Sequence, residues 1–470
     1  SLVILHNNFY LQHKGMIMKN RMHFFDYEMY EKGFGTEAMR NLWSERGILQ
    51  QWIDFEVYLA QAQAELGMIP QDVADEITKK GNIDLIGIDK IADIFGTTNL
   101  NTVALIRAYK AICENGAGEF IHYGATSQDV LDSTLAFRIK KSLESYRADL
   151  EQIVSVLLPL ADKYRNAVMA GITHGQHAIP VTFGFVVATW AQAFKEHIER
   201  IDQALPRICT GTVSGAAGNF ASYNLLFGEK CWDMQVKVLE KFGLTVPPIS
   251  VQPRNERFVE YMYLCSLIAN TCEKIADDIV FNQRNEVMQL EEPFDTEHQI
   301  CSSTMPQKRN PVLCENIKGL ATLIRSNATA QGEIFHRDLR DDTPFFVEDV
   351  RMPETAILMD SMLKEMLTVL KGLKVHEENM RKNLDKDEGL LMAEPLALLL
   401  SIKSGKKDTA MRIVHKIAME SFEKKIPYEQ YVKELPELRE YLTEQESVDI
   451  LNPTNYLGLT QKAIDNVIKG

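Results

Sequence analysis

The chain has no excess of positive charge, and this absence removes one class of function. Its 470 residues carry 51 lysines and arginines against 65 aspartates and glutamates, a formal net charge of -14. A surface that binds nucleic acid needs a field of positive charge to collect phosphates. We therefore expect no nucleic-acid partner, and any anionic substrate has to be held by local cations.

Long apolar runs and paired cysteines are also missing. No apolar stretch approaches the roughly 20 residues that cross a bilayer, so we expect no membrane partner. The seven cysteines include no close pairs between Cys113 and Cys314, which gives neither a disulfide framework nor a zinc pattern. His174 and His177 lack further ligands at a suitable spacing, so we predict no metal and no cofactor. This cysteine usage fits a reducing cytoplasm.

Residues 1–17 do not read as part of the folded protein. They begin with an apolar run over residues 2–5, but they lack the basic segment and the length of a signal peptide. We interpret them as leader or added sequence, and we place the start of the first domain at Met18.

Strand-like alternation of apolar and polar residues is nearly absent, and helical periodicity dominates. Stretches with almost no internal proline or glycine cover residues 135–166, 183–205, 255–287, 312–335 and 355–375. They predict an all-α fold, a three-domain subunit built around a central bundle of long helices. We expect an N-terminal helical domain over 18–129, the bundle over 130–376 and a small helical domain over 377–470.

One of these stretches predicts association between subunits. A helix over residues 255–287 would span about 50 Å, more than a single subunit needs for its own core. Its apolar positions include Phe258, Tyr261, Leu264, Leu267 and Ile268. They are too many for one buried stripe on a solvated helix, so we expect neighbours on several sides.

The loop over residues 302–311 reads Ser-Ser-Thr-Met-Pro-Gln-Lys-Arg-Asn-Pro. Asn310 is a good N-cap and Pro311 suits the first helical position, so a helix is predicted to begin there with its positive end toward the loop. Lys308 adds a full charge, beside which Ser302 could be held as an anion after losing its proton. An ordinary serine-rich loop before a capped helix would have the same local pattern.

This loop closely resembles the signature of the aspartase/fumarase superfamily, in the branch of adenylosuccinate lyases and 3-carboxy-cis,cis-muconate cycloisomerases. Two more blocks resemble the same branch in the same order. Residues 122–129 read His-Tyr-Gly-Ala-Thr-Ser-Gln-Asp, and residues 173–178 read Thr-His-Gly-Gln-His-Ala. The resemblance implies an enzyme that removes a proton next to a carboxylate and expels a leaving group. It also implies a homotetramer with a shared helical core and active sites shared between subunits.

The resemblance also implies roles for individual residues. Ser302 would be the base that takes the carbon-bound proton, and Lys308 would stabilise the developing charge. His174 would protonate the leaving group, a task suited to a side chain that titrates near neutrality, with Glu315 as a partner of the catalytic histidine. The implied substrate-binding residues are His122, Thr126, Ser127, Gln128, Thr173, Gln176, His177, Ser303, Met305, Asn310 and Arg337.

Two of these positions also have plain structural interpretations. His174 could cap a helix that begins near Pro180. The polar residues before the next long helix could hold a substrate carboxylate, but Ser127 or Asp129 could equally serve as that helix's N-cap.

Other loops carry weaker signals. Residues 288–302 have no convincing period and contain Pro293, and they predict a mobile lid. Cys301 stands where the family usually has glycine, a change that bears on the flexibility of this lid. Residues 214–219, Ser-Gly-Ala-Ala-Gly-Asn, match a further glycine-bearing loop, which could also cradle a phosphate.

Two regions differ from adenylosuccinate lyases where those enzymes bind their nucleotide. Residues 97–101 replace an Arg-His-Asp block, so a second site histidine is missing. Asp341 and Asp342 stand where a phosphate-holding Ser-His-Ser-Ser run is expected. Two carboxylates would oppose a phosphate unless they are turned away or paired with Arg340. These differences argue against a purine nucleotide substrate.

The sequence therefore predicts a lyase of adenylosuccinate-lyase type that releases fumarate from a small succinyl adduct by β-elimination. The bond that breaks would be carbon to nitrogen or carbon to sulfur. The alternatives are a 3-carboxy-cis,cis-muconate cycloisomerase, an S-(2-succino)cysteine-type lyase and a non-enzymatic structural homologue. Loss of Ser302, Lys308 or His174 would have marked the structural homologue, and all three are present.

Overall fold

The computed structural model of the protein describes residues 23–30, 33–300, 302–341 and 343–470. The expected leader over 1–17 lies outside these residues. Helices make up nearly all of the regular structure in the described ranges, which confirms the predicted all-α class. No helix within those ranges is long and apolar enough to cross a membrane.

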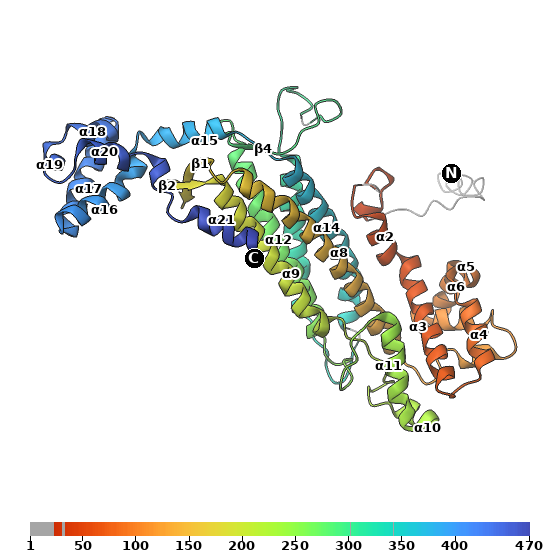
Figure 1. Ribbon diagram of the computed structural model, residues 1–470. Helices are drawn as coiled ribbons and strands as arrows, with labels where there is room; N and C mark the ends of the chain where they lie inside the picture. Colours follow the sequence, from red (N-terminus) through yellow and green to blue (C-terminus); the bar gives the residue numbers. More distant parts are fainter. Residues whose placement is uncertain (1–22, 31–32, 301, 342) are drawn as a thin grey trace.

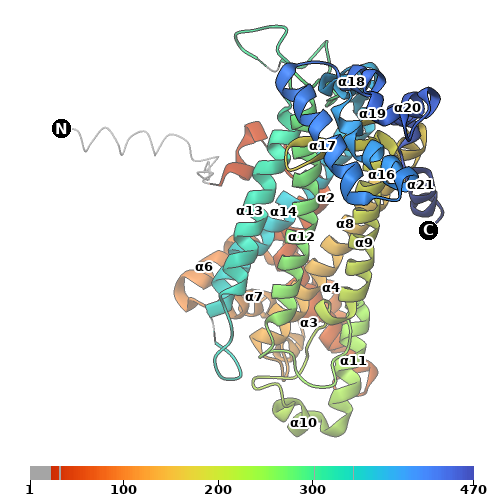
Figure 2. The ribbon, with the colours of Figure 1, turned by 90° about the vertical axis from the view of Figure 1, so that its left-hand side faces the viewer.

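Long helices run side by side as the central bundle (Figures 1 and 2). They are α8 (Ser127–Lys163), α9 (Phe183–Ile208), α12 (Glu256–Asn282), α13 (Val312–Gly332) and α14 (Thr343–Gly372). The largest difference from the prediction is the start of α14, which was expected at residue 355, after Pro353. The helix instead begins at Thr343 and continues through this proline. Packing of α14 against α8 and α13 offsets the loss of the backbone hydrogen bond that a proline removes.

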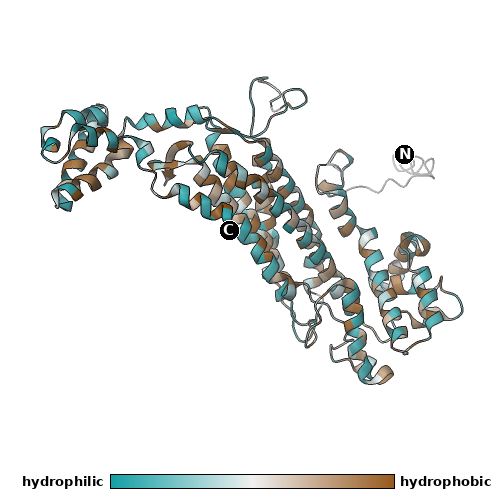
Figure 3. Cartoon of the chain, in the orientation of Figure 1, coloured by the Kyte–Doolittle hydropathy of each residue, from teal (hydrophilic) through white to brown (hydrophobic). Residues whose placement is uncertain are grey.

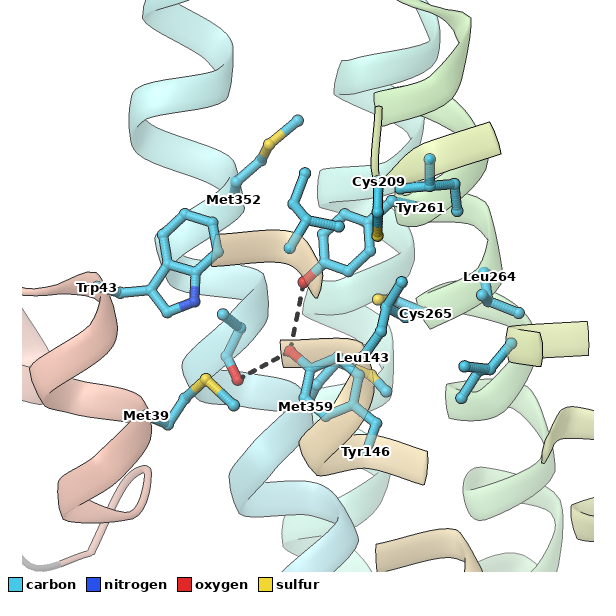
Figure 4. Close-up of a cluster of buried hydrophobic side chains, with 14 of the residues drawn as sticks. Met39, Trp43, Leu143, Tyr146, Cys209, Tyr261, Leu264, Cys265, Met352 and Met359 are labelled. Atoms are coloured by element: carbon cyan, nitrogen blue, oxygen red, sulfur yellow. Dashed lines mark hydrogen bonds between the residues drawn. The ribbon is translucent and has the colours of Figure 1, made fainter. Parts of the chain in front are cut away.

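An apolar core joins α8, α12 and α14. Figure 4 shows its middle, where Tyr146 of α8 points toward Tyr261 of α12 with 3.3 Å between the hydroxyl oxygens. Trp43 enters the same cluster and donates its Nε1–H to Ser142 Oγ at 2.9 Å. These aromatic side chains are buried with their polar atoms bonded, so they hold the N-terminal helices to the bundle. Apolar and polar residues alternate along the bundle helices (Figure 3).

The N-terminal helices pack on one side of this bundle through α2 and α3. They are α2 (Glu37–Trp43), α3 (Glu45–Glu65), α4 (Gln71–Lys80), α5 (Ile83–Ile86), α6 (Ile88–Thr98) and α7 (Asn101–Lys110). Two shorter helices, α10 (Ala221–Phe227) and α11 (Cys231–Phe242), lie at the lower end in Figures 1 and 2. Short 3-10 turns are η1 (Phe24–Asp26), η2 (Glu28–Tyr30), η3 (Ala117–Phe120) and η4 (Gly228–Lys230).

Short antiparallel strands, which the sequence analysis did not predict, lie at the upper end of the bundle. One hairpin is formed by β1 (Val168–Thr173) and β2 (Gln176–Thr182), and β3 (Leu290–Glu291) pairs with β4 (Lys374–Val375). The hairpin turn consists of His174 and Gly175, whose φ angles are 52° and 76°. Positive φ at both turn residues matches the twist of a two-residue hairpin.

The C-terminal segment forms a second group of helices with an apolar core of its own. It contains α15 (Glu377–Leu384), α16 (Ala393–Ser404), α17 (Lys407–Lys424), α18 (Tyr428–Glu434), α19 (Pro436–Arg439) and α20 (Glu444–Ile450). The turns among them are η5 (Asp385–Asp387), η6 (Leu390–Met392) and η7 (Pro453–Asn455). The last helix, α21 (Thr460–Lys469), returns to the bundle, where Lys195 Nζ of α9 donates to Val467 O at 2.7 Å. The domain boundaries stay predictions.

The thiols in the described part of the chain are unpaired and mostly inside the protein. Cys209, Cys231, Cys265, Cys272 and Cys314 are buried, and Cys113 is partly buried. Burial raises the pKa of Cys265 and of Cys272 to about 12.

The crossing of α8 and α9 allows no added volume at Gly184, and this makes a testable prediction. A Cβ there would lie 2.4 Å from Ala161 O and 2.7 Å from the backbone nitrogen of Arg165. We expect Gly184→Ala to lower the free energy of unfolding by about 1–3 kcal/mol, the usual cost of overpacking, and to lower Tm in calorimetry. Gly96→Ala in α6 is the matched control, because its Cβ would meet no atom within 4 Å. Equal Tm changes in the two variants would contradict this account.

Candidate active site

The signature loop over residues 302–311 joins β3 to α13 at the upper end of the bundle in Figure 1. Ser302 Oγ accepts the N–H of Met305 at 3.0 Å and the N–H of Thr304 at 3.4 Å. The N–H of Lys308 in turn donates to Met305 O at 3.1 Å. N–H groups directed at the hydroxyl oxygen would stabilise negative charge on it, which is what a serine base requires.

The predicted cap of α13 is wrong. Pro311, not Asn310, is the N-cap residue, and the capping carboxylate comes from Glu292. Its Oε1 accepts the N–H of Leu313 at 3.2 Å, and its Oε2 accepts the N–H of Cys314 at 3.0 Å. A carboxylate at this position satisfies the unpaired N–H groups of the first turn better than a neighbouring amide could. The positive end of α13 is therefore already occupied and does not face an incoming anion.

A cleft of about 760 Å³ lies between the signature loop and the end of α12. It brings together four residues predicted for the site, namely Met305, Lys308, Asn310 and Glu315. Sequence reasoning missed Gln283, Arg284 and Asn285, which also line the cleft, because a helix was expected to run on to residue 287. It also missed Glu291, which lies in the segment predicted as a lid. The helix instead ends at Asn282, and this frees the following residues to turn into the cleft.

Exposed cations line this cleft, among them Arg284 and Lys308. Glu291 lies 3.5 Å from Arg309 and 3.2 Å from His376, so these side chains compensate one another. Lys308 is exposed, and no other described residue forms an ion pair or side-chain hydrogen bond with its ammonium group. The ammonium group of Lys308 is thus available to a carboxylate that enters the cleft.

The second motif lies at the tip of the β1–β2 hairpin. Thr173, His174 and Gln176 are exposed there, and His174 has the positive φ of a turn residue. His177 is held from the C-terminal segment, with 2.6 Å between its Nδ1 and Asp387 Oδ2. The suggestion that His174 caps a helix near Pro180 is wrong.

A different residue provides that cap. Pro180 lies in β2, and α9 begins at Phe183. Thr182 is its N-cap, and its side chain accepts the N–H of Phe185 at 3.2 Å.

The third motif lies at the start of α8, near α10 at the lower end of Figures 1 and 2. His122 has a φ of 63°, and its ring Nδ1 lies 2.7 Å from Glu56 Oε1. The His122 N–H also donates to Glu56 Oε2 at 2.8 Å. Burial alone would lower the pKa of His122, but the Glu56 carboxylate, with help from Asp129, outweighs burial and raises it.

The polar residues after His122 are ordered by neighbours. Thr126, not Ser127, is the N-cap of α8, and its N–H donates to Asp129 Oδ2 at 3.2 Å. Ser127 Oγ accepts the hydroxyl of Thr102 at 2.6 Å, and buried Gln128 donates to Asp132.

Asp129 is fully buried and ties this motif to a distant loop. Its carboxylate accepts the N–H of Ser214 at 2.9 Å, that of Gly215 at 3.1 Å and the amide of Gln252 at 3.3 Å. Burial raises the pKa of Asp129 to about 6. Because these N–H groups already bind Asp129, the loop over residues 214–219 does not present them to a phosphate. Only its position in the first turn of α8, three residues after the N-cap Thr126, could have marked Asp129 in the sequence.

Arg337 lies in the loop between α13 and α14, also at the lower end, and its side chain is exposed. Its backbone N–H donates to the Asp341 carboxylate, so Asp341 is bound within its own loop. Asp342 lies outside the described residues. Asp341 was expected to oppose a phosphate, but its carboxylate accepts a backbone N–H of its own loop instead.

A single chain does not bring these motifs together. The start of α8 is separated from the upper end of the bundle by a helix of 37 residues, about 55 Å long. No hydrogen bond or ion pair within the described ranges joins Ser302 or Lys308 to His122 or His174. Ser303 is exposed and, like Ser302, lies outside the lining of the cleft. The same ranges contain no cluster of histidine, cysteine or carboxylate side chains that could hold a metal.

The family model described as Lyase matches residues 32–325 of the chain. Adenylosuccinate lyase of Methanocaldococcus jannaschii is 38% identical over 438 residues, which cover 93% of this chain and 94% of that protein. The chain belongs to the aspartase/fumarase superfamily. Within this superfamily it falls in the branch of adenylosuccinate lyases and 3-carboxy-cis,cis-muconate cycloisomerases, and it is a lyase.

Other members of this superfamily match over the same length. N-acetyl-S-(2-succino)cysteine lyase of Dickeya dadantii is 34% identical, covering 95% of this chain and 97% of that protein. The crystal structure of a fumarate lyase from Mesorhizobium sp. BNC1 has a TM-score of 0.85 at 30% identity, covering 93% of this chain and 98% of that one. The 3-carboxy-cis,cis-muconate lactonizing enzyme of Pseudomonas putida has a TM-score of 0.85 at 26% identity, covering 94% and 98%.

The pair of His122 and Glu56 gives a testable prediction. Removing the carboxylate in Glu56→Gln leaves burial as the main effect, so the pKa of His122 should fall below its usual value near 6.5. NMR titration of labelled histidine measures this change. Glu119→Gln, at an exposed position of the preceding turn, is the control and should leave the titration unchanged.

The sign of the effect on stability follows from linkage. The pKa of His122 is raised on folding, so the stabilisation from this pair is complete below pH 6.5 and is lost as the pH rises through the raised value. An unshifted His122 titration in Glu56→Gln would contradict the assigned cause.

Proposed function

We propose that the protein is a fumarate-releasing lyase that removes an amine or a thiol from a small succinyl adduct. The observation that carries the proposal is the signature loop, in which Ser302 Oγ accepts backbone N–H groups and Lys308 faces a cleft without a partner among the described residues. Full-length similarity to lyases of succinyl compounds supports the same reaction class.

In the proposed reaction, Ser302 takes a proton from the carbon next to a carboxylate. The charge that develops on this carboxylate is stabilised by Lys308, while Asn310, Met305 and Ser303 help to hold the succinyl group. The carbon–hydrogen bond and the bond to nitrogen or sulfur break, and the carbon–carbon double bond of fumarate forms. His174 gives its proton to the departing atom, and Glu315 acts as its partner.

We further propose a homotetramer in which the three motifs meet between subunits. The length of α8, which separates the third motif from the other two within one chain, supports this assembly, since His122 and Ser302 could then come from different copies. We expect His174 to meet Ser302 across a subunit boundary as well. Apolar side chains on the outer face of the bundle support it as well. Tyr263 and Leu267 of α12 and Leu323 of α13 are about half exposed, although they lie on the long central helices. Residues from the lower end, including His122, Thr126 and Ser127, would complete each site from a further copy.

The position of residues 97–101 supports a small substrate. This segment joins α6 to α7, and Thr102, the next residue, donates to Ser127. The segment that lacks the Arg-His-Asp block therefore borders the third motif. A specific observation keeps adenylosuccinate as the second candidate: Asp341 is turned toward the backbone of Arg337, which removes part of the expected repulsion of a phosphate.

The shared site can be tested by subunit complementation. We expect Ser302→Ala and His174→Ala each to lower kcat by about 10²–10⁴-fold, because each removes a proton-transfer group. Mixed tetramers of the two variants should regain part of the activity, because some sites then receive both native residues. Fumarate release is followed by its ultraviolet absorbance.

The control for this experiment is Thr304→Ala, a change in the same exposed turn that removes neither proton-transfer group. Near-normal turnover in Ser302→Ala would refute the assignment of the base. Full activity of a monomer, checked by size exclusion with light scattering, would refute the shared site.

The substrate class can be tested by direct comparison. We expect small unphosphorylated succinyl-amino acids or succinyl-thiols to give a higher kcat/KM than adenylosuccinate, because the phosphate-holding block is replaced by acidic residues. 3-Carboxymuconate belongs in the same panel, and its lactonisation would identify a cycloisomerase. Efficient cleavage of adenylosuccinate, equal to or above that of the small adducts, would restore the purine assignment.

A further inference from the structure

The two halves of the signature loop are held very differently. In the first half, the hydrogen bonds of Ser302 and Met305 with other described residues all go to neighbours within the loop. The described residues from Ser303 to Arg309 are all exposed. In the second half, the Arg309 carbonyl and the first turn of α13 bond to residues outside the loop. The difference indicates a fixed half and a half that can move separately.

Glu292 and Gln283 form the anchor of the second half. Gln283, the C-cap residue of α12, donates its side-chain amide to Arg309 O at 3.2 Å. Its Oε1 accepts the N–H of Glu292 at 2.9 Å, so one amide joins both segments. The Glu292 carboxylate then binds Leu313 and Cys314 at the start of α13. Glu292 is 3% exposed and Gln283 is 8% exposed, which protects these hydrogen bonds from competition with water.

This anchor binds backbone that is adjacent in sequence to the residues that face the cleft. Lys308 precedes the bonded Arg309 carbonyl, and Asn310 separates that carbonyl from Pro311, the N-cap residue of α13. Fixing the backbone on both sides of Asn310 restricts where the side chains of Lys308 and Asn310 can reach. Glu292 therefore acts on the cleft through the backbone, because it does not line the cleft, whereas Gln283 also forms part of the cleft wall.

We propose that Glu292, together with Gln283, is a positioning residue that holds Lys308 and Asn310 ready for the substrate carboxylate before binding. Ser302 stays on the half that can close over the substrate afterward. The inference rests on the proposed function for the identity of the ligand, a succinyl carboxylate, and on the hydrogen bonds above for the anchor itself.

The proposal makes a specific kinetic prediction. When the anchor is weakened, the free protein samples more loop conformations, and the ligand has to select the competent one. Once the ligand is bound, it holds Lys308 in place itself, so the chemical step proceeds nearly as before. The loss should therefore appear in KM and in the affinity for fumarate. A general loss of folding would instead lower the active fraction, and kcat would fall with KM unchanged.

The test uses Glu292→Gln, which keeps the shape of the side chain but leaves only one oxygen for the two N–H groups. We expect KM for the best succinyl adduct and Kd for fumarate to rise about tenfold, with kcat within about threefold of the native enzyme. Hydrogen exchange at the amides of Leu313 and Cys314 should become faster. Glu273→Gln is the matched control, because it breaks the ion pair with Arg325 between the same helices, α12 and α13, away from the cleft.

A second variant keeps the proposal testable if Glu292→Gln fails to fold. Gln283→Met removes both amide bonds and should also raise KM. In the double variant the increases in KM, expressed as free energies, should be less than additive, since both side chains belong to one anchor. Unchanged KM and fumarate affinity, or a fall in kcat alone, would overturn the proposal.

The exchange measurement separates this inference from the proposed function. It needs no substrate, so unchanged exchange at Leu313 and Cys314 in Glu292→Gln refutes the anchor whatever the activity of the enzyme. If exchange becomes faster but the native protein neither binds fumarate nor cleaves any succinyl adduct, the proposed function fails and the positioning role fails with it.

Discussion

Long helices can bury a common core only when they run side by side, and this constraint fixes where every loop of the protein lies. The connections of the bundle are confined to its two ends, and α8 alone separates these ends by 37 residues of helix. Motifs that follow different helices are therefore distributed between opposite ends. The proposed reaction uses all of them and hence more than one copy of the chain, and we propose that copies associate through the partly exposed apolar residues on α12 and α13.

The helices and the chemical motifs could be found from the sequence because both depend on neighbouring residues. The helical period of apolar residues and the positions of proline and glycine predicted most helix ends to within a few residues. The signature loop is contiguous in the sequence. The supporting residues could not be found in this way. Glu56 reaches His122 from 66 residues away, and Asp387 reaches His177 from 210 residues away. No local pattern indicates such a partner, since only the packed fold determines which carboxylate lies next to each histidine.

The N-cap of α13 was predicted wrongly for the same reason, because the carboxylate that caps this helix is distant in the sequence. Asn310 followed by Pro311 is a good local start signal, yet a carboxylate 21 residues upstream of Leu313 occupies the helix end. A full negative charge at a helix N-terminus is a stronger partner than a neutral amide. Within a chain of net charge -14, the buried acids serve in this way as internal ligands for N–H groups, as Asp129 also does. The exposed Lys308 is then left for an external anion.

The buried thiols have a consequence for an enzyme that would release fumarate. Fumarate is an electrophilic alkene, and a cysteine adds to such an alkene as the thiolate. Five of the six described cysteines are buried, and Cys113 is partly buried. Burial raises the pKa of Cys265 and of Cys272 to about 12, so that these thiols stay protonated near neutral pH. Burial thereby makes the thiols of Cys265 and Cys272 poor targets for alkylation by such an alkene.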